Sequence, residues 1–257
     1  MGSESFLLPA AGLFGGIVML LIGLAKRYKA SRLAGYRRTA TGQLRPGEKQ
    51  LVSGPAARLA DLTAPISKKN CVFYREDVER LVVRTGRKHA STQWVKEGTN
   101  AVGGFRLDDG SGGVLVFPSP GCLDFSREAL TEDSDIVATE GSLRRTEQAL
   151  FDGDQVTVIG VPVTLARVME SVRAGAQLNL PTDLLGALVK LEKEGGADTP
   201  CFFGQSIGTL ADLGYGEYSA ETSSSAKFYL QAGGLLAGLG AAMLIYLLVQ
   251  STPSSEF

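Results

Sequence analysis

The chain contains two long apolar segments without a single charged residue, one near each end of the sequence. They cover residues 6–25 and 228–249. An α-helix needs about 20 predominantly apolar residues to cross the hydrocarbon core of a bilayer, and each segment has about that length. The sequence therefore predicts an integral membrane protein with two transmembrane helices and, between them, about 200 residues that suffice for one folded domain.

The distribution of basic residues predicts how such a protein would be oriented. Residues 1–5 and 251–257 contain no Lys or Arg, whereas the inner flanks of the two segments carry Lys26, Arg27, Lys29, Arg32, Arg37, Arg38 and Lys227. By the positive-inside rule, the central domain faces the cytoplasm and both termini lie outside. Glu4 stands where a cleavable signal peptide would carry a basic residue, which favours a retained anchor.

Small residues are spaced for helix packing in both predicted spans. Gly12 and Gly16 form one GxxxG pattern, and Gly234 and Gly238 form another, which is joined by Ala237, Gly240 and Ala241. Glycines at this spacing let two helix backbones approach closely in a membrane. Two interpretations stay open: the two spans of one chain pack on each other, or the same faces join several copies into a homo-oligomer.

Residues 26–47 are predicted to form a basic juxtamembrane linker. We expect the first helix to continue to about Leu33 and to end at Gly35. Anionic lipid head groups would attract this stretch. The alternative interpretation is that its charges set the topology and do nothing more.

The domain at residues 48–225 begins with a β-rich sequence. Short β-branched or aromatic runs alternate with turn residues, and we expect strands near residues 71–74, 80–85, 104–107, 113–117 and 155–159. Asp108, Asp109 and Gly110 begin a glycine-rich stretch that predicts a β-hairpin turn. It lacks the GxxxxGK[ST] pattern of a phosphate loop, and paired acids beside glycine are common turn formers, so no metal site is predicted on them.

Helical features follow the strands. Leucines at positions 184, 185, 188 and 191 have helical spacing and predict an amphipathic helix inserted at about residues 178–194, with Thr182 or Asp183 as its N-cap and Gly195 as its stop. It would cover one sheet face, with binding to a membrane surface or a partner as the alternative. Residues 200–203 are interpreted as the last strand, and residues 207–225 as a helix leading into the second span. The predicted fold class is α+β: two transmembrane helices flank a β-rich, partly barrel-like domain.

Charge and side-chain chemistry exclude several classes of function. The net charge is −1, and a nucleic-acid binder needs a basic surface, so no nucleic-acid partner is expected. Cys71, Cys122 and Cys201 are odd in number and widely spaced, which indicates neither a disulfide framework nor a zinc site. His89 is the single histidine, and we expect it in a solvated loop. No catalytic, cofactor-binding or metal-ligating set is predicted.

Several motif blocks between the two spans resemble the GIDE domain, also called the BAM ("beside a membrane") domain. The blocks run over residues 64–75, 105–116 and 147–160, and the residues that carry the resemblance are Pro65, Cys71, Tyr74, Arg75, Trp94, Asp108, Asp109, Gly110, Gly153, Asp154 and Gly160. The resemblance covers nearly the whole chain. It implies a membrane-anchored protein related to the mitochondrial ubiquitin ligases in which this domain lies between two transmembrane helices.

The resemblance departs from those ligases in one respect. Their RING follows the second span, and here residues 250–257 offer none of its ligands. The chain is more similar to the RING-less prokaryotic members, which implies a prokaryotic plasma membrane. We expect a non-catalytic interaction or sensing module with an unknown protein partner. The alternatives are a scaffold subunit of a ubiquitin-ligase-like transferase whose catalytic domain is on another chain, and a membrane-organising oligomer.

Overall fold

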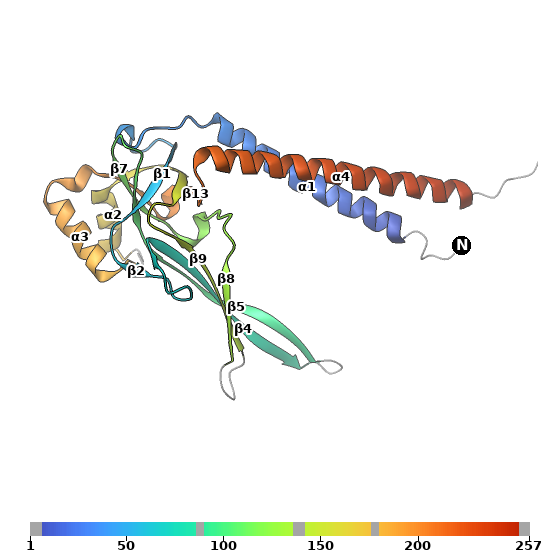
Figure 1. Ribbon diagram of the computed structural model, residues 1–257, viewed down its shortest axis with the longest axis horizontal. Coiled ribbons are helices and arrows are strands. Elements are labelled where there is room, and N and C mark those ends of the chain that lie inside the picture. The colour runs from blue at the N-terminus through green and yellow to red at the C-terminus, as the bar shows by residue number, and fades with distance from the viewer. Residues whose placement is uncertain (1–6, 86–89, 136–141, 176–179, 252–257) are drawn as a thin grey trace, which may run out of the picture. The chain divides into compact units, whose positions relative to one another are not determined.

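The computed structural model describes residues 7–85, 90–135, 142–175 and 180–251 (Figure 1). The chain divides into two compact units. A helix pair is formed within Met1–Tyr36 and Gly216–Phe257, and a central domain spans Arg37–Tyr215. The fold class is α+β, as expected: two long apolar helices flank a β-rich domain with a curled sheet.

The helix pair consists of α1 (Leu7–Gly35) and α4 (Tyr215–Ser251). Both are long and apolar enough to cross a membrane. The predicted extension of the first span is present, because α1 continues through the basic stretch and ends at Gly35. The second helix begins 13 residues before the apolar segment, so the residues just before that segment belong to the same continuous helix.

The two helices pack antiparallel through glycine. A Cβ atom added at Gly16 would lie 2.3 Å from the backbone nitrogen of Ala237, and one added at Gly240 would lie 2.5 Å from that of Leu13. Such distances require glycine, because the neighbouring atoms belong to backbone. Gly12 faces the same contact, with its Cβ position 3.9 Å from the Cα of Gly240.

In the second helix, only some of the expected small residues make the contact: Ala237 and Gly240 do, and Gly233, which was not singled out, does as well. Positions Gly234 and Gly238 have nothing within 4 Å of an added Cβ, whereas Gly233 faces Leu20 and Gly16. The expected contact between the two helices is therefore present, but Gly234 and Gly238 lie outside it. The buried glycines Gly16 and Gly23, like Gly233 and Gly240, are seven residues apart, the repeat of an antiparallel coiled-coil seam.

The central domain is built on a seven-stranded curled sheet, which we call the half-barrel. Its strand order is β11-β12-β7-β6-β1-β10-β13, with β12 and β7 parallel and the other neighbours antiparallel. Its strands are β1 (Gln50–Arg58), β6 (Phe105–Asp108), β7 (Gly113–Phe117), β10 (Gln155–Gly160), β11 (Val163–Thr164), β12 (Pro200–Phe203) and β13 (Ile207–Ala211).

Two apolar clusters hold the half-barrel together. The first contains the fully buried Phe73, Phe105 and Phe202 together with the alternate apolar residues of β1 and β10. The second packs α2 (Leu165–Arg173) and α3 (Thr182–Lys193) against β7 and β12 (Figure 1). Alternation of side chains along the strands supplies the first cluster, and helical spacing of leucines supplies the second.

A second, four-stranded antiparallel sheet forms what we call the arm, which projects from the half-barrel in Figure 1. Its strand order is β5-β4-β9-β8. The strands are β4 (Phe73–Thr85), β5 (Ala90–Gly103), β8 (Leu130–Asp135) and β9 (Ser142–Leu150). A short ribbon of β2 (Leu62–Thr63) and β3 (Asn70–Cys71) precedes β4. Four 3₁₀ turns complete the described chain: η2 (Thr41–Gln43), η3 (Pro120–Cys122), η4 (Gly196–Asp198) and η5 (Gly204–Ser206).

Three local expectations were wrong, and helix α2 was not predicted. Residues 207–225 are not one helix, because Ile207–Ala211 pair with β10 as strand β13 before α4 begins at Tyr215. Residues 200–203 form strand β12, but they are not the last strand, since β13 follows them. The inserted helix α3 starts at Thr182, but its N-cap is Pro181, and neither Thr182 nor Asp183 caps it. The expected stop is confirmed, since Gly195 adopts the left-handed conformation with φ of 98°.

The chain passes from β13 into α4 over three residues, and both ends of this connection are tied to the half-barrel. The hydroxyl of Thr157 donates a hydrogen bond of 2.9 Å to the carbonyl of Leu213. The backbone N–H of Tyr215 donates one of 3.0 Å to the hydroxyl of Ser53. The strand-to-helix junction is thus part of the central domain.

Candidate functional site

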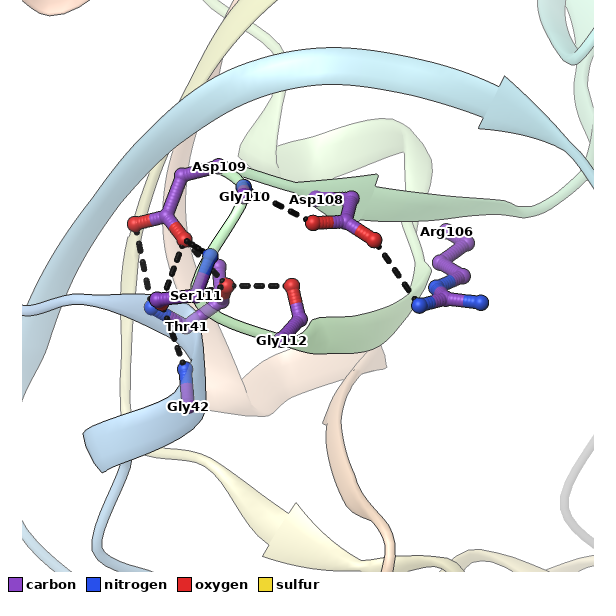
Figure 2. A network of polar contacts seen from close by, with 8 residues as sticks. All are labelled: Thr41, Gly42, Arg106, Asp108, Asp109, Gly110, Ser111 and Gly112. Carbon is purple, nitrogen blue, oxygen red and sulfur yellow. Dashed lines mark hydrogen bonds and ion pairs between the residues drawn. The ribbon is translucent and has the colours of Figure 1, made fainter.

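The predicted hairpin turn at Asp108–Gly110 exists and serves as a clamp (Figure 2). The carboxylate of Asp109 accepts hydrogen bonds from the backbone N–H of Thr41, at 3.1 Å, and from the backbone N–H and hydroxyl of Ser111, at 3.1 and 2.6 Å. The hydroxyl of Thr41, which is 1% exposed, lies 2.6 Å from this carboxylate. The turn η2 is thereby fixed to the β6–β7 hairpin.

The electrostatics of Asp109 follow from these contacts. Partial desolvation acts to raise its pKa, but the hydrogen bonds from Ser111 and Thr41 outweigh it and hold the pKa well below the ordinary value of 3.8. The neighbouring Asp108 accepts a hydrogen bond from the N–H of Gly110 and pairs with Arg106 at 2.8 Å. Both carboxylates therefore stabilise the turn, in line with the structural interpretation of the sequence.

A second predicted block, around Pro65, is organised by a buried carboxylate. Glu147 on β9 is 2% exposed and accepts hydrogen bonds from the backbone N–H groups of Ile66, at 2.5 Å, and Ser67, at 3.3 Å. Lys68 closes this turn with a positive φ of 56°. Because burial of an unpaired carboxylate is costly, these two donors fix the turn to strand β9.

The Gly153–Gly160 block also has structural roles. Asp154 accepts a hydrogen bond of 2.9 Å from the N–H of Phe151 and pairs with Arg127 at 2.9 Å. Gly153 has a positive φ of 87°. An added Cβ at Gly160 would lie 2.4 Å from the carbonyl oxygen of Ser206, at a bulge in the pairing of β10 with β13.

Three of the motif residues lie on the arm. Arg75 pairs with Asp77 at 2.7 Å, and Lys96 binds the same carboxylate at 2.7 Å. Burial, followed by the nearby charge of Glu76, raises the pKa of Tyr74. The guanidinium of Arg144 stacks on the ring of Trp94 on β5, and its central carbon lies 4.2 Å from the centroid of that ring. These residues stabilise the pairing of strands and form no reactive group.

The three cysteines are buried and unpaired. Burial raises the pKa of Cys71 and of Cys201 to about 12, and it also raises the pKa of Cys122. Burial of this kind disfavours the thiolate that a nucleophilic cysteine needs.

A cleft of about 570 Å³ lies where the base of β5 meets η3, α2 and η5. Its wall is partly apolar, with Phe117, Val163 and Phe203, and partly polar, with Arg167 and Gln205. Its volume falls in the range of about 300–1,000 Å³ that is typical of binding pockets. Ala101 and Gly103 at the end of β5 also line it, so the outer edge of the arm ends at the cleft.

The edge strand above the cleft is long and exposed. β5 has β4 as its strand partner and forms one border of the arm. Between Ser91 and Gly98, every residue except Trp94 is exposed. An edge of this kind presents backbone donors and acceptors to which an extended peptide can pair.

Within the residues that the structure describes, no group of three or more His, Cys, Asp or Glu side chains is placed to hold a metal ion. His89, expected in a solvated loop, lies outside the described residues. No family model matches the chain, and neither a curated protein nor a solved structure shows significant similarity to it.

Sequence reasoning missed two features of this region. The cleft was missed because its wall combines residues from β5, β7, α2 and η5, which share no sequence pattern. Thr41 was missed because it lies far in sequence from Asp109 and no motif marks it. The packing glycines of α4, in contrast, had a signal: Gly233 and Gly240 repeat at seven residues, as do Gly16 and Gly23.

Proposed function

We propose that the chain is a membrane-tethered, non-catalytic interaction module of the GIDE/BAM type. The helix pair would anchor it as a two-pass protein with its central domain in the cytoplasm of a prokaryotic cell. The motif blocks and the basic flanks of the spans support this assignment. The observation that carries the interaction role is the exposed edge of β5, which leads into the cleft at its base.

The mode of binding follows from that geometry. An extended segment of a partner protein adds as a strand to β5, since main-chain hydrogen bonds supply affinity without demanding a particular sequence. Where the segment reaches the cleft, an apolar side chain enters between Phe117 and Phe203. The cleft thus gives the selectivity that strand addition lacks.

Site-specific cross-linking in cells tests this proposal. A photoreactive side chain at Gln93, on the exposed edge, and one at Arg167, in the cleft, should capture the same partner protein. Filling the cleft with Ser171→Trp should abolish both captures. The matched control is Glu170→Trp, on the exposed side of α2 and outside the cleft lining. Unchanged capture in Ser171→Trp, or different partners at the two positions, would refute the proposal.

The open glycine face of α4 favours a second candidate function, a membrane-organising oligomer. Gly234 and Gly238 have free space around them within the described chain, and glycines at this spacing suit close helix contacts between copies. Gly234→Leu should then abolish cross-linked oligomers in membranes, whereas Leu235→Ala, beside it, should not. Equal oligomer yields from Gly234→Leu and the unmodified chain would eliminate this candidate.

A further inference from the structure

A groove in the helix pair combines cationic and hydroxyl side chains with an apolar floor. It has a volume of about 520 Å³ and is lined by Arg27 and Ser31 from α1, by Ser223 and Lys227 from α4, and by Ala30, Ala226 and Leu230. We call it the basic groove. The short side chains of the two alanines leave the space between the helices open at this level.

The polar residues of the basic groove form two matched pairs. Ser31 follows Arg27 by four residues on α1, and Lys227 follows Ser223 by four residues on α4. Residues four apart lie on the same face of a helix, one turn from each other. Because both helices present such a pair to one groove, two positive charges and two hydroxyl donors converge there.

The two cations of the basic groove differ from the neighbouring lysines of α1 in their contacts. Lys26 lies over the ring of Tyr229 and Lys29 over that of Tyr218, each at 5.3 Å. In the described part of the chain, neither Arg27 nor Lys227 makes an ion pair or stacks on a ring. Both side chains are exposed. They are therefore available to an anionic ligand from outside the chain.

The position of the basic groove along the helices indicates what kind of ligand would fit it. Its cations stand at the ends of the two uncharged segments, next to Lys26 and Phe228, which is the level of lipid head groups if the helices span a bilayer. Leu230 extends the lining toward the apolar part of the pair, where it packs on Gly23. A ligand that fits has a negative head and an apolar tail.

We propose that the basic groove is a binding site for an anionic phospholipid. The head-group phosphate lies between the guanidinium of Arg27 and the ammonium of Lys227 and accepts hydrogen bonds from the hydroxyls of Ser31 and Ser223. One acyl chain follows Leu230 along the helix pair. The proposal rests on membrane anchoring, but not on the partner site at β5, so the two sites fail or succeed in separate experiments.

Native mass spectrometry of the full chain, released from detergent after titration with phosphatidylglycerol, tests the proposal. Arg27→Gln and Lys227→Gln should each weaken retention of the lipid about fivefold, the effect of one cation near an anionic surface. Arg32→Gln removes an equal charge from the same basic stretch but lies outside the groove, so it should retain the lipid. Equal losses in Arg27→Gln and Arg32→Gln would reduce the site to diffuse attraction and overturn the proposal.

Two substitutions that leave the net charge unchanged test whether lipid binding depends on the shape of the basic groove. Ser223→Leu fills the groove, whereas Ser224→Leu adds the same bulk at the neighbouring exposed position outside the lining. Lipid retention should fall in the first and persist in the second. Phosphatidylcholine and inorganic phosphate serve as ligand controls. Retention of phosphatidylcholine equal to that of phosphatidylglycerol, or displacement of the lipid by inorganic phosphate, would overturn the proposal of an anionic lipid site.

Discussion

The half-barrel and the arm are built from antiparallel strands of the same chain, yet they are stabilised in different ways. Phe73 and Leu150, where β4 and β9 leave the half-barrel, are fully buried. Farther out, ion pairs join the strands of the arm, such as Arg145 on β9 with Glu76 on β4, and Arg80 on β4 with Glu97 on β5. Apolar burial is worth far more than partly exposed ion pairs. The half-barrel therefore supplies most of the stability, and the arm is free to present a surface.

The half-barrel and the arm should differ most in how much stability is lost when a large apolar side chain is replaced by alanine. Phe105→Ala in the half-barrel should lower the free energy of unfolding by about 3–5 kcal/mol, since it empties a fully buried site. Leu81→Ala on the arm, where the side chain is half-buried, should cost about 1 kcal/mol. Denaturant unfolding in detergent, followed by hydrogen exchange of peptides from each region, measures both. Similar costs would show that the arm has a core of its own.

An intermediate effect is expected at the clamp of the half-barrel. Asp109→Ala should cost about 1–3 kcal/mol, because it leaves the backbone N–H of Thr41 without its acceptor and removes the bonds to Ser111. Since the folded state lowers the pKa of Asp109, its contribution is present above the ordinary pKa of 3.8 and is lost as the pH falls below it. Unfolding between pH 7 and pH 2 should therefore lose less stability in Asp109→Ala than in the unmodified chain. Asp108→Ala, at the exposed side of the turn, is the control.

The smallest effect is expected on the arm. Arg144 binds Asp133 at 2.9 Å and covers the ring of Trp94. Arg144→Gln should lower the free energy of unfolding only slightly, and the loss should shrink at high salt because the ion pair is exposed and screened. Fluorescence of Trp94, the single tryptophan, reports the local change. A loss that is large and insensitive to salt would contradict the contrast between the two regions.

The same contrast explains how much could be predicted from sequence. The strands β6, β7 and β10 of the half-barrel are short runs rich in β-branched and other apolar residues next to turn glycines, so these strands and the Asp108–Gly110 turn were predicted near their observed places. The arm strands carry charges on both faces and show little alternation, which is why β8 and β9 gave no signal. Strand β13 was taken for helix because its five residues lie only three residues before a long helix, and Gly208 and Gly214 were not recognised as breaks in a helical pattern.

Several residues singled out from the sequence make long-range contacts, but their partners were not predicted. Asp109, Asp154 and Gly160 stood out through local patterns, whereas Thr41, Arg127 and Ser206 meet them across long sequence separations. Such pairs depend on how the sheet curls, which no local pattern encodes. The cleft and the basic groove share this property, since each is lined by segments that are distant in the chain.

The short junction between β13 and α4 has a mechanical consequence. Any tension along α4 enters the central domain at Tyr215 and is carried first by the bonds to Ser53 and Leu213. Behind them stands β13, a border strand with β10 as its strand neighbour. A border strand can peel away one rung at a time, whereas an inner strand must break two ladders at once. Of the two border strands of the half-barrel, β13 is the one that continues into a long apolar helix, and on its other edge only a single bridge, from Leu210 to Leu123, supports it in the described chain. Tension along α4 would therefore load a strand that shares a full ladder with one neighbour.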